Sequence, residues 1–233
     1  MNYAFLILNY STVLNRLGKR HILYFMKTSN KFTTVRIVAA PVFFIIYFLP
    51  DWVHCVPESL LSNISACILI PLLAFAEFTD FLDGYFARKH NEVSDFGKMF
   101  DPFADVFLHL GTFTCFVFSG YMPPVLFVLI LYREFGQSFL RMVVAKSGTA
   151  IAARKGGKLK TVFYVASCFW ALIQECLYRT GLGSHWNIDM NAMYWIGVGF
   201  FIACVLLSYI SFIDYLKQFG KILKDAANDN GKK

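Results

Sequence analysis

Residues 80–105 read DFLDGYFARKHNEVSDFGKMFDPFAD, and apolar runs near 60–80 and 100–120 overlap the two ends of this stretch. Each run has roughly the 20 residues that a helix needs to cross a bilayer. Four aspartates of the stretch recur at helical spacings: Asp80, Asp83, Asp101 and Asp105. Ionisable groups at such depths are costly to bury and mark functional sites by default. The stretch therefore predicts a polar site on the ends of two membrane helices.

The composition of the whole chain agrees with a membrane location. Of 233 residues, 57% are hydrophobic, 18% are aromatic and only 16% are charged. A soluble domain has about 25% charged and about 45–50% apolar residues. The composition excludes a disordered chain and a nucleic-acid binder built on basic low-complexity sequence. The net charge of +7 indicates a positive-inside bias together with an anionic ligand.

The apolar runs predict an all-α integral membrane protein with six transmembrane helices in one bundle. We expect the helices near 32–50, 60–80, 100–120, 123–145, 159–180 and 192–214. Residues 28–216 then form one domain, and 217–233 form a cytoplasmic tail. Residues 1–27 mix apolar and basic side chains, which suits an amphipathic helix on the membrane surface. Alternatively, translation starts at Met26.

The distribution of Lys and Arg predicts the orientation in the membrane. The segment before the first span, the loops after the second and fourth spans and the C-terminal tail are all basic, whereas the opposite connections offer only Arg179. Basic connections stay in the cytoplasm. We therefore expect both termini and the aspartate stretch at the cytoplasmic face of the cell (inner) membrane.

Two stripes of small and acidic residues are predicted within the aspartate stretch. One face of the first helix has the spacing i, i+3, i+4 and i+7: Asp80, Asp83, Gly84 and Ala87. On the second helix Gly97, Asp101 and Asp105 recur every four residues, and Pro102 is expected in the first turn of a helix that Asp101 caps. The small residues let a bulky ligand approach the main chain.

Four carboxylates that converge in such a site require a counter-charge, because like charges raise one another's pKa. Hard divalent cations with oxygen ligands supply it, which points to Mg²⁺ or Mn²⁺. Two such ions can clamp a diphosphate. The alternative, a set of helix caps and loop acids, accounts for one or two of the aspartates but not for four on matched stripes.

The stretch is identified as the signature of the CDP-alcohol phosphotransferase family, D-x2-D-G-x2-A-R-x8-G-x3-D-x3-D, at all eight fixed positions. The resemblance implies a six-helix homodimeric enzyme that transfers a phosphoalcohol group from a CDP-linked donor and releases CMP. It assigns Asp80, Asp83 and Asp101 to metal binding and Asp105 to general-base catalysis with a contact to the second metal. It assigns four positions to CDP binding: Gly84, Ala87, Arg88 and Gly97. Arginine matches phosphate geometry.

Further segments are similar to phosphatidylglycerophosphate synthases. Asn30, Thr33 and Arg36 resemble an N-x2-T-x2-R opening, without the usual proline. An RE…R…GKxKT pattern is also present: Arg133, Glu134, Arg141, Lys158 and Lys160. The resemblance implies that its four basic residues bind the acceptor phosphate. It gives Glu134 and the residues of the N-x2-T-x2-R segment a supporting role. The implied substrates are CDP-diacylglycerol, delivered from the membrane lipid, and glycerol 3-phosphate.

Several alternatives stay open. Val106 stands where many of these synthases have lysine, so the acceptor is alternatively phosphatidylglycerol, as in a cardiolipin synthase, inositol phosphate or a neutral alcohol. Remoter alternatives are a transporter and a non-catalytic membrane scaffold. Two polar residues inside the spans remain without a role. Glu77 is a candidate partner of Arg36 or Arg133, and His109 is interpreted as a packed polar residue.

Overall fold

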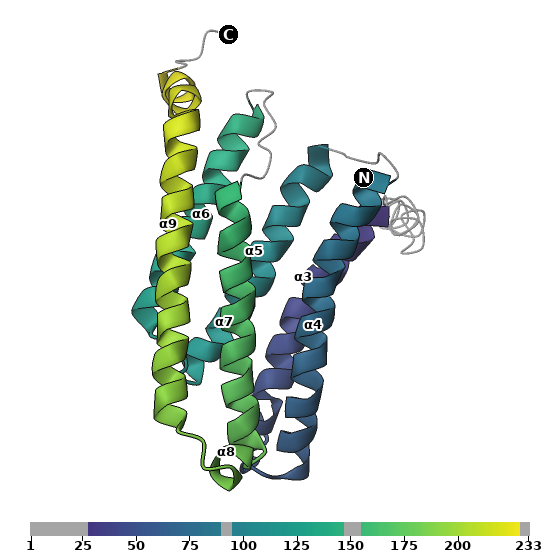
Figure 1. The fold of residues 1–233 in the computed structure, drawn as a ribbon. Coiled ribbons are helices and arrows are strands. Elements are labelled where there is room, and N and C mark those ends of the chain that lie inside the picture. Colours follow the sequence, from purple (N-terminus) through teal and green to yellow (C-terminus); the bar gives the residue numbers. More distant parts are fainter. Residues whose placement is uncertain (1–27, 90–94, 147–154, 229–233) are drawn as a thin grey trace, which may run out of the picture.

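The computed structural model describes residues 28–89, 95–146 and 155–228 (Figure 1). All regular elements in this part of the chain are helices and none is a strand, which confirms the predicted all-α class. Its elements are α3 (Thr28–Trp52), α4 (Leu60–Lys89), α5 (Asp95–Phe118), α6 (Pro124–Lys146), α7 (Lys155–Arg179), α8 (Leu182–His185) and α9 (Met190–Asn228). The segment 1–27, with its two alternative interpretations, lies outside the described residues.

The six long helices of the described residues, α3 to α7 and α9, run alternately up and down one bundle, so that α3 begins and α9 ends at the same end (Figure 1). Among the described residues, four segments are long and apolar enough to cross a membrane: Lys31–Trp52, Leu60–Asp80, Leu159–Arg179 and Met190–Gly220. The other two long helices, α5 and α6, carry the polar residues of the predicted sites, which lower their mean hydropathy.

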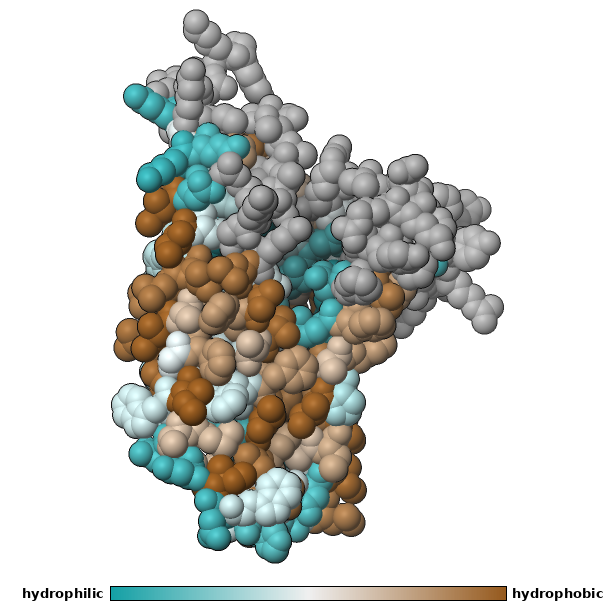
Figure 2. All heavy atoms as spheres, viewed as in Figure 1, coloured by the Kyte–Doolittle hydropathy of each residue, from teal (hydrophilic) through white to brown (hydrophobic). Residues whose placement is uncertain are grey.

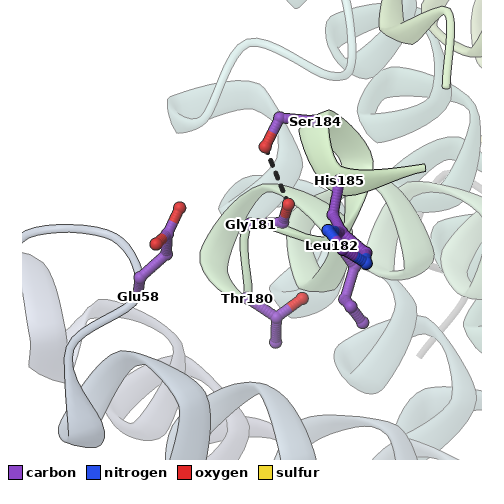
Figure 3. A pocket seen from close by; sticks show the side chains of 6 residues that line it. All are labelled: Glu58, Thr180, Gly181, Leu182, Ser184 and His185. Atoms are coloured by element: carbon purple, nitrogen blue, oxygen red, sulfur yellow. Dashed lines mark hydrogen bonds between the residues drawn. The ribbon is translucent and has the colours of Figure 1, made fainter. Parts of the chain in front are cut away.

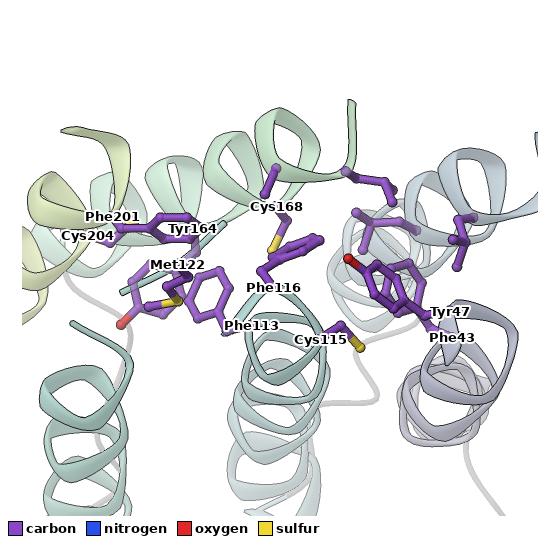
Figure 4. Close-up of a cluster of buried hydrophobic side chains, with 14 of the residues drawn as sticks. Phe43, Tyr47, Phe113, Cys115, Phe116, Met122, Tyr164, Cys168, Phe201 and Cys204 are labelled. Atoms are coloured by element: carbon purple, nitrogen blue, oxygen red, sulfur yellow. The ribbon is translucent and has the colours of Figure 1, made fainter. Parts of the chain in front are cut away.

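Packing around α3 and α7 organises the bundle. α3 packs against both α4 and α5, and α7 packs against α9 and α4, whereas α4 and α5 have few close contacts with each other within the described residues. Phe113 and Phe116 of α5 lie between Phe43 of α3 on one side and Tyr164 of α7 and Phe201 of α9 on the other (Figure 4). Each of these aromatic side chains is fully buried. The interior is therefore aromatic and continuous across the helices.

The outer surface is also strongly apolar, as expected for a bundle surrounded by lipid. Large side chains such as Ile45, Phe75, Phe139 and Ile210 are about half exposed or more. Figure 2 shows hydrophobic residues over the middle of the visible face and hydrophilic residues mainly toward its ends. A patch of this size on a soluble monomer would be unusual.

The end of the bundle remote from the aspartates is closed by a buried ion pair. Arg179 donates to Glu175 (2.5 Å), to the Ser65 hydroxyl (2.8 Å) and to the main-chain carbonyl of Tyr47 (2.7 Å). The only basic residue expected on this side is thus not a loop residue but the buried last residue of α7. Burial and the neighbouring Glu175 carboxylate raise the pKa of Tyr121 above its usual range.

Two helix boundaries differ from the sequence expectation. α5 begins at Asp95, so Asp101 is not its cap and Pro102 lies in its interior instead of its first turn. Proline is tolerated there without ending the helix, and Gly97, Asp101 and Asp105 consequently lie on one continuous helix. α9 runs to Asn228, well past the expected end of the last span at 214.

Candidate active site

A buried arginine brings two of the aspartates together. Nη1 of Arg36 on α3 donates to Asp80 of α4 (2.6 Å) and also to Asp105 of α5. The Arg36 side chain is only 1% exposed, whereas those of Asp80 and Asp105 are 45% and 34% exposed. The carboxylates are therefore anchored on the buried side and open on the other. Figure 2 shows hydrophilic residues inside a hollow of the visible face.

One turn earlier on α3, a second side chain holds the third aspartate. The buried Thr33 hydroxyl donates to Asp101 across 2.6 Å. Three aspartates from two helices thus meet the same face of α3, which the spacing of Thr33 and Arg36 produces. From the sequence, Asn30, Thr33 and Arg36 were expected only to support the acceptor site. In the structure, Thr33 and Arg36 bring the aspartates together.

The remaining residues predicted for this site lie at the same end of the bundle by their place in the helices. Asp83, Gly84, Ala87 and Arg88 are on the last turns of α4, and Gly97 is on the first turn of α5. Asn30 and Lys158 are on the first turns of α3 and α7. Of these, only Gly97 is described beyond its backbone, and it is buried.

The donor set fits a hard divalent cation. All donors are oxygens, and the Asp80 and Asp105 carboxylates already converge on a single cationic nitrogen of Arg36. Oxygen donors of this kind suit Mg²⁺ and Mn²⁺. Among the described residues, which leave out the Asp83 side chain, no three acidic, histidine or cysteine residues form a ready-made metal site.

Glu134 of α6 is the centre of a second, buried polar cluster. Its Oε1 accepts from Nη1 of Arg133 (2.8 Å), from Nζ of Lys160 (2.9 Å) and from the Tyr164 hydroxyl (2.9 Å). Lys160 also lies over the Tyr164 ring, 4.5 Å from its centre. One carboxylate thus fixes two cations from α6 and α7, so the cluster has a net positive charge.

The basic residues of α6 differ in depth. Arg133 is 4% exposed, and its Nε donates to the Ser208 carbonyl of α9 (2.8 Å). Arg141, two turns nearer the end of α6, is partly exposed. Between them lies Gln137, which is 1% exposed and has no hydrogen-bond partner for either amide atom in the described structure. Arg141 and Lys160 are therefore more available to a ligand than Arg133.

Glu77 and His109 join the two clusters. Nε2 of His109 lies 3.3 Å from Glu77 Oε1, Nδ1 lies 2.8 Å from the main-chain oxygen of Asp105, and the ring is 5.5 Å from that of Tyr164. Glu77 thus faces His109, in place of the arginines considered from the sequence. The signal was available in the spacing, since Glu77 precedes Asp80 by one turn and His109 follows Asp105 by one turn.

Two hollows lie elsewhere in the bundle. An apolar groove of about 800 Å³ between α3, α5 and α6 is lined by Val106, Phe107, Glu134 and Phe139, among others. Val106 thus faces this groove, where a lysine would place a charge among aromatic rings. A smaller hollow of about 460 Å³ lies at the far end, between Glu58 and the turn around Gly181 (Figure 3).

The turn beside that smaller hollow has little room for other residues. Gly181 has a φ of +68°, and an added Cβ would come within 2.4 Å of Glu58. The Ser184 hydroxyl donates back to the Gly181 carbonyl (2.8 Å; Figure 3). These contacts indicate that the turn is a structural connection between α7 and α9.

Comparison with known proteins shows similarity to one protein family over most of the chain. The family model described as CDP-alcohol phosphatidyltransferase matches residues 26–207. A protein of Treponema pallidum named CDP-diacylglycerol–glycerol-3-phosphate 3-phosphatidyltransferase is 39% identical over 85% of this chain and 92% of its own length. Proteins of the same name from Bacillus subtilis (38% identical over 57% of this chain and 69% of its own length) and Mycoplasma genitalium (28% over 86% and 89%) are also similar.

Proposed function

This chain belongs to the CDP-alcohol phosphatidyltransferase family, and we propose on that premise that it transfers the phosphatidyl group of CDP-diacylglycerol to glycerol 3-phosphate. The products are phosphatidylglycerophosphate and CMP. The names of relatives such as the Treponema pallidum protein support this acceptor. The observation that carries the proposal is the convergence of Asp80 and Asp105 on buried Arg36, at the end of the bundle that also holds Lys160 and Arg141.

Two divalent cations, Mg²⁺ or Mn²⁺, would be held by Asp80, Asp83, Asp101 and Asp105. When bound, they neutralise the diphosphate of the donor and the charge that develops on the leaving CMP. The protein's own contribution is to hold the carboxylates close together and oriented. Arg36 and Thr33 do this from α3, because their hydrogen bonds fix one oxygen of each carboxylate and leave the other side of the group open.

Asp105 is the general base of the proposed reaction. Its carboxylate takes the proton of the acceptor hydroxyl, whose oxygen attacks the phosphorus that carries diacylglycerol. The bond between this phosphorus and the bridging oxygen breaks, and CMP leaves with that oxygen. Gly84, Ala87, Arg88 and Gly97 would bind the CDP moiety, with the small residues admitting the nucleotide close to the main chain.

The basic cluster would bind the phosphate of the acceptor. Arg141 and Lys160, together with Lys158 at the start of α7, supply the direct charges, and Arg133 adds its remaining donors from deeper in the bundle. Glu134 orders Arg133 and Lys160, because both donate to one of its oxygens, which also accepts from the Tyr164 hydroxyl. A net positive pocket suits an anionic acceptor and would gain nothing from a neutral alcohol.

All six long helices would cross the membrane, with both termini and the active site at the cytoplasmic face of the cell membrane. The apolar outer surface supports this arrangement. Labelling in sealed vesicles tests it: a Lys224→Cys residue at the end of α9 should react from the cytoplasmic side, and native Cys55, between α3 and α4, from the other. Labelling of both from one side would contradict the topology.

A homodimer is part of the proposal, as the family resemblance implies. The groove between α3, α5 and α6 offers aromatic side chains for such a contact, including Phe103, Phe107 and Phe135. Light scattering of the detergent-solubilised protein, corrected for bound detergent, should give the mass of two chains. A mass of one chain that does not change with protein concentration would contradict the dimer.

The proposed activity is tested with purified protein, CDP-diacylglycerol, Mn²⁺ or Mg²⁺ and competing acceptors: glycerol 3-phosphate, phosphatidylglycerol, inositol phosphate and glycerol. Lipid products and CMP are identified by mass spectrometry, with a chelator control. We expect metal-dependent formation of phosphatidylglycerophosphate as the dominant product. CMP release with another lipid product would overturn the acceptor assignment alone. Well-folded protein that releases no CMP would favour a scaffold.

A further inference from the structure

A buried acid–histidine pair lies one helical turn below the aspartates. Glu77 of α4 and His109 of α5 approach to 3.3 Å, and their side chains are only 16% and 6% exposed. α4 runs toward the site and α5 runs away from it (Figure 1), so a residue one turn before Asp80 meets a residue one turn after Asp105. The pair therefore connects the two helices directly beneath the proposed metal ligands.

The His109 imidazole contacts the main chain, Glu77 and two aromatic rings. Nδ1 lies 2.8 Å from the main-chain oxygen of Asp105, and because a carbonyl can only accept, Nδ1 carries a hydrogen and donates it. Nε2 lies 3.3 Å from Glu77 Oε1 in an ion-pair contact that does not have hydrogen-bond geometry. The rings of Phe113 (6.4 Å) and Tyr164 (5.5 Å) lie side by side against one flank of the imidazole. The Nδ1 hydrogen bond and the contact of Nε2 with Glu77 together link the position of Glu77 to the backbone of Asp105.

The contact between Glu77 and His109 matters because α4 and α5 make few other direct contacts in the described structure. In the described structure, both helices pack against α3, but they have few close contacts with each other. Their relative register, and with it the placement of Asp80 opposite Asp105, therefore depends on side-chain bridges. Arg36 provides one bridge at the level of the carboxylates, and Glu77–His109 provides the second, one turn deeper.

We propose that Glu77 and His109 are positioning residues that hold α5 in register with α4, so that Asp80 and Asp105 face the same bound cations. The inference rests on the metal site of the proposed function. Groups behind metal ligands typically contribute a factor of roughly 10–100 to metal affinity or activity. Neither residue ligates the metal in this proposal; they act through the main chain of Asp105.

Mn²⁺ affinity of the full-length, detergent-purified protein, measured without substrate by electron paramagnetic resonance of the free ion, tests the proposal. Glu77→Gln and His109→Gln should each weaken Mn²⁺ binding roughly 10–100-fold. The double variant should be no weaker than either single one, because both substitutions remove the same contact. The two variants probe the contact from different helices, so failure of one to fold still leaves a test.

Glu175→Gln is the matched control, because it breaks a buried acid–cation pair (2.5 Å to Arg179) at the far end of the bundle. It should lower the melting temperature but leave Mn²⁺ affinity unchanged. Wild-type Mn²⁺ affinity in Glu77→Gln, or an equal loss in Glu175→Gln, would overturn the positioning role while leaving the proposed function intact. Wild-type protein that binds no Mn²⁺ would overturn the metal site and the positioning role together.

Discussion

Arg36 of α3 and Asp80 of α4 are joined by a 2.6 Å hydrogen bond although 44 residues separate them in the chain. The same nitrogen of Arg36 also contacts Asp105, so one buried cation joins three helices. The guanidinium lies where two carboxylates would otherwise repel each other. α3 is thus part of the site itself and not only a membrane anchor that precedes it.

Asp105→Asn should abolish nearly all turnover while CDP binding is retained. The amide cannot take a proton from the acceptor hydroxyl, and loss of a general base typically lowers the rate roughly 10²–10⁴-fold. Single-turnover rates and equilibrium binding of CDP separate the two effects. Near wild-type turnover in this variant would contradict the assignment of Asp105 as the base.

Arg36→Met should destabilise the metal-free protein, and Mn²⁺ should restore more stability to this variant than to the wild type. Hydrogen bonds to charged groups contribute about 1.5–3 kcal/mol each, and their loss leaves Asp80 and Asp105 facing each other without a counter-charge. Melting temperatures in chelator and in Mn²⁺ measure the effect. An equal Mn²⁺-induced shift in both proteins would show that Arg36 does not bear on the carboxylate charges.

The sequence was sufficient to predict the helical class and the two acid-bearing helices, because periodicity and hydropathy act locally along the chain. The spacing also indicated that Gly97, Asp101 and Asp105 would share one face if the whole segment were helical. It did not predict that α5 begins before Asp101, since the proline at 102 resembled a helix start and the tertiary packing that extends the helix is not visible locally.

The partners of the buried polar residues could not be predicted from the sequence, for a different reason. Glu77 had several cations within plausible reach, and only the crossing of α4 and α5 selects His109. Likewise the positive-inside pattern placed Arg179 in a far-side connection, whereas packing buries it against Glu175 and Ser65. Such choices depend on which helices become neighbours, and periodicity carries no information about that.

Lys160→Gln should raise the KM for glycerol 3-phosphate while the KM for CDP-diacylglycerol stays unchanged. A charge-assisted bond to phosphate is worth about 1.5–3 kcal/mol, which corresponds to roughly 10–100-fold in affinity. Lys224→Gln, which removes an exposed charge near the end of α9, is the control and should alter neither constant. A parallel rise of both KM values in Lys160→Gln would argue against a dedicated acceptor pocket.

Gln137→Leu and Gln174→Leu form a matched pair that separates stability from acceptor binding. Both glutamines are 1% exposed, and within the described structure neither amide group has a hydrogen-bond partner. An unsatisfied buried polar group costs about 1–3 kcal/mol, so each substitution by a similarly sized apolar residue should raise the melting temperature.

Gln174 lies toward the far end of α7, against Trp170 and Gly197, whereas Gln137 lies between Arg133 and Arg141 on α6. Only Gln137→Leu should therefore raise the KM for glycerol 3-phosphate, because a bound acceptor would supply the missing partner. An unchanged KM in Gln137→Leu, with the expected gain in stability, would show that this glutamine faces packed protein and that the acceptor pocket ends short of it.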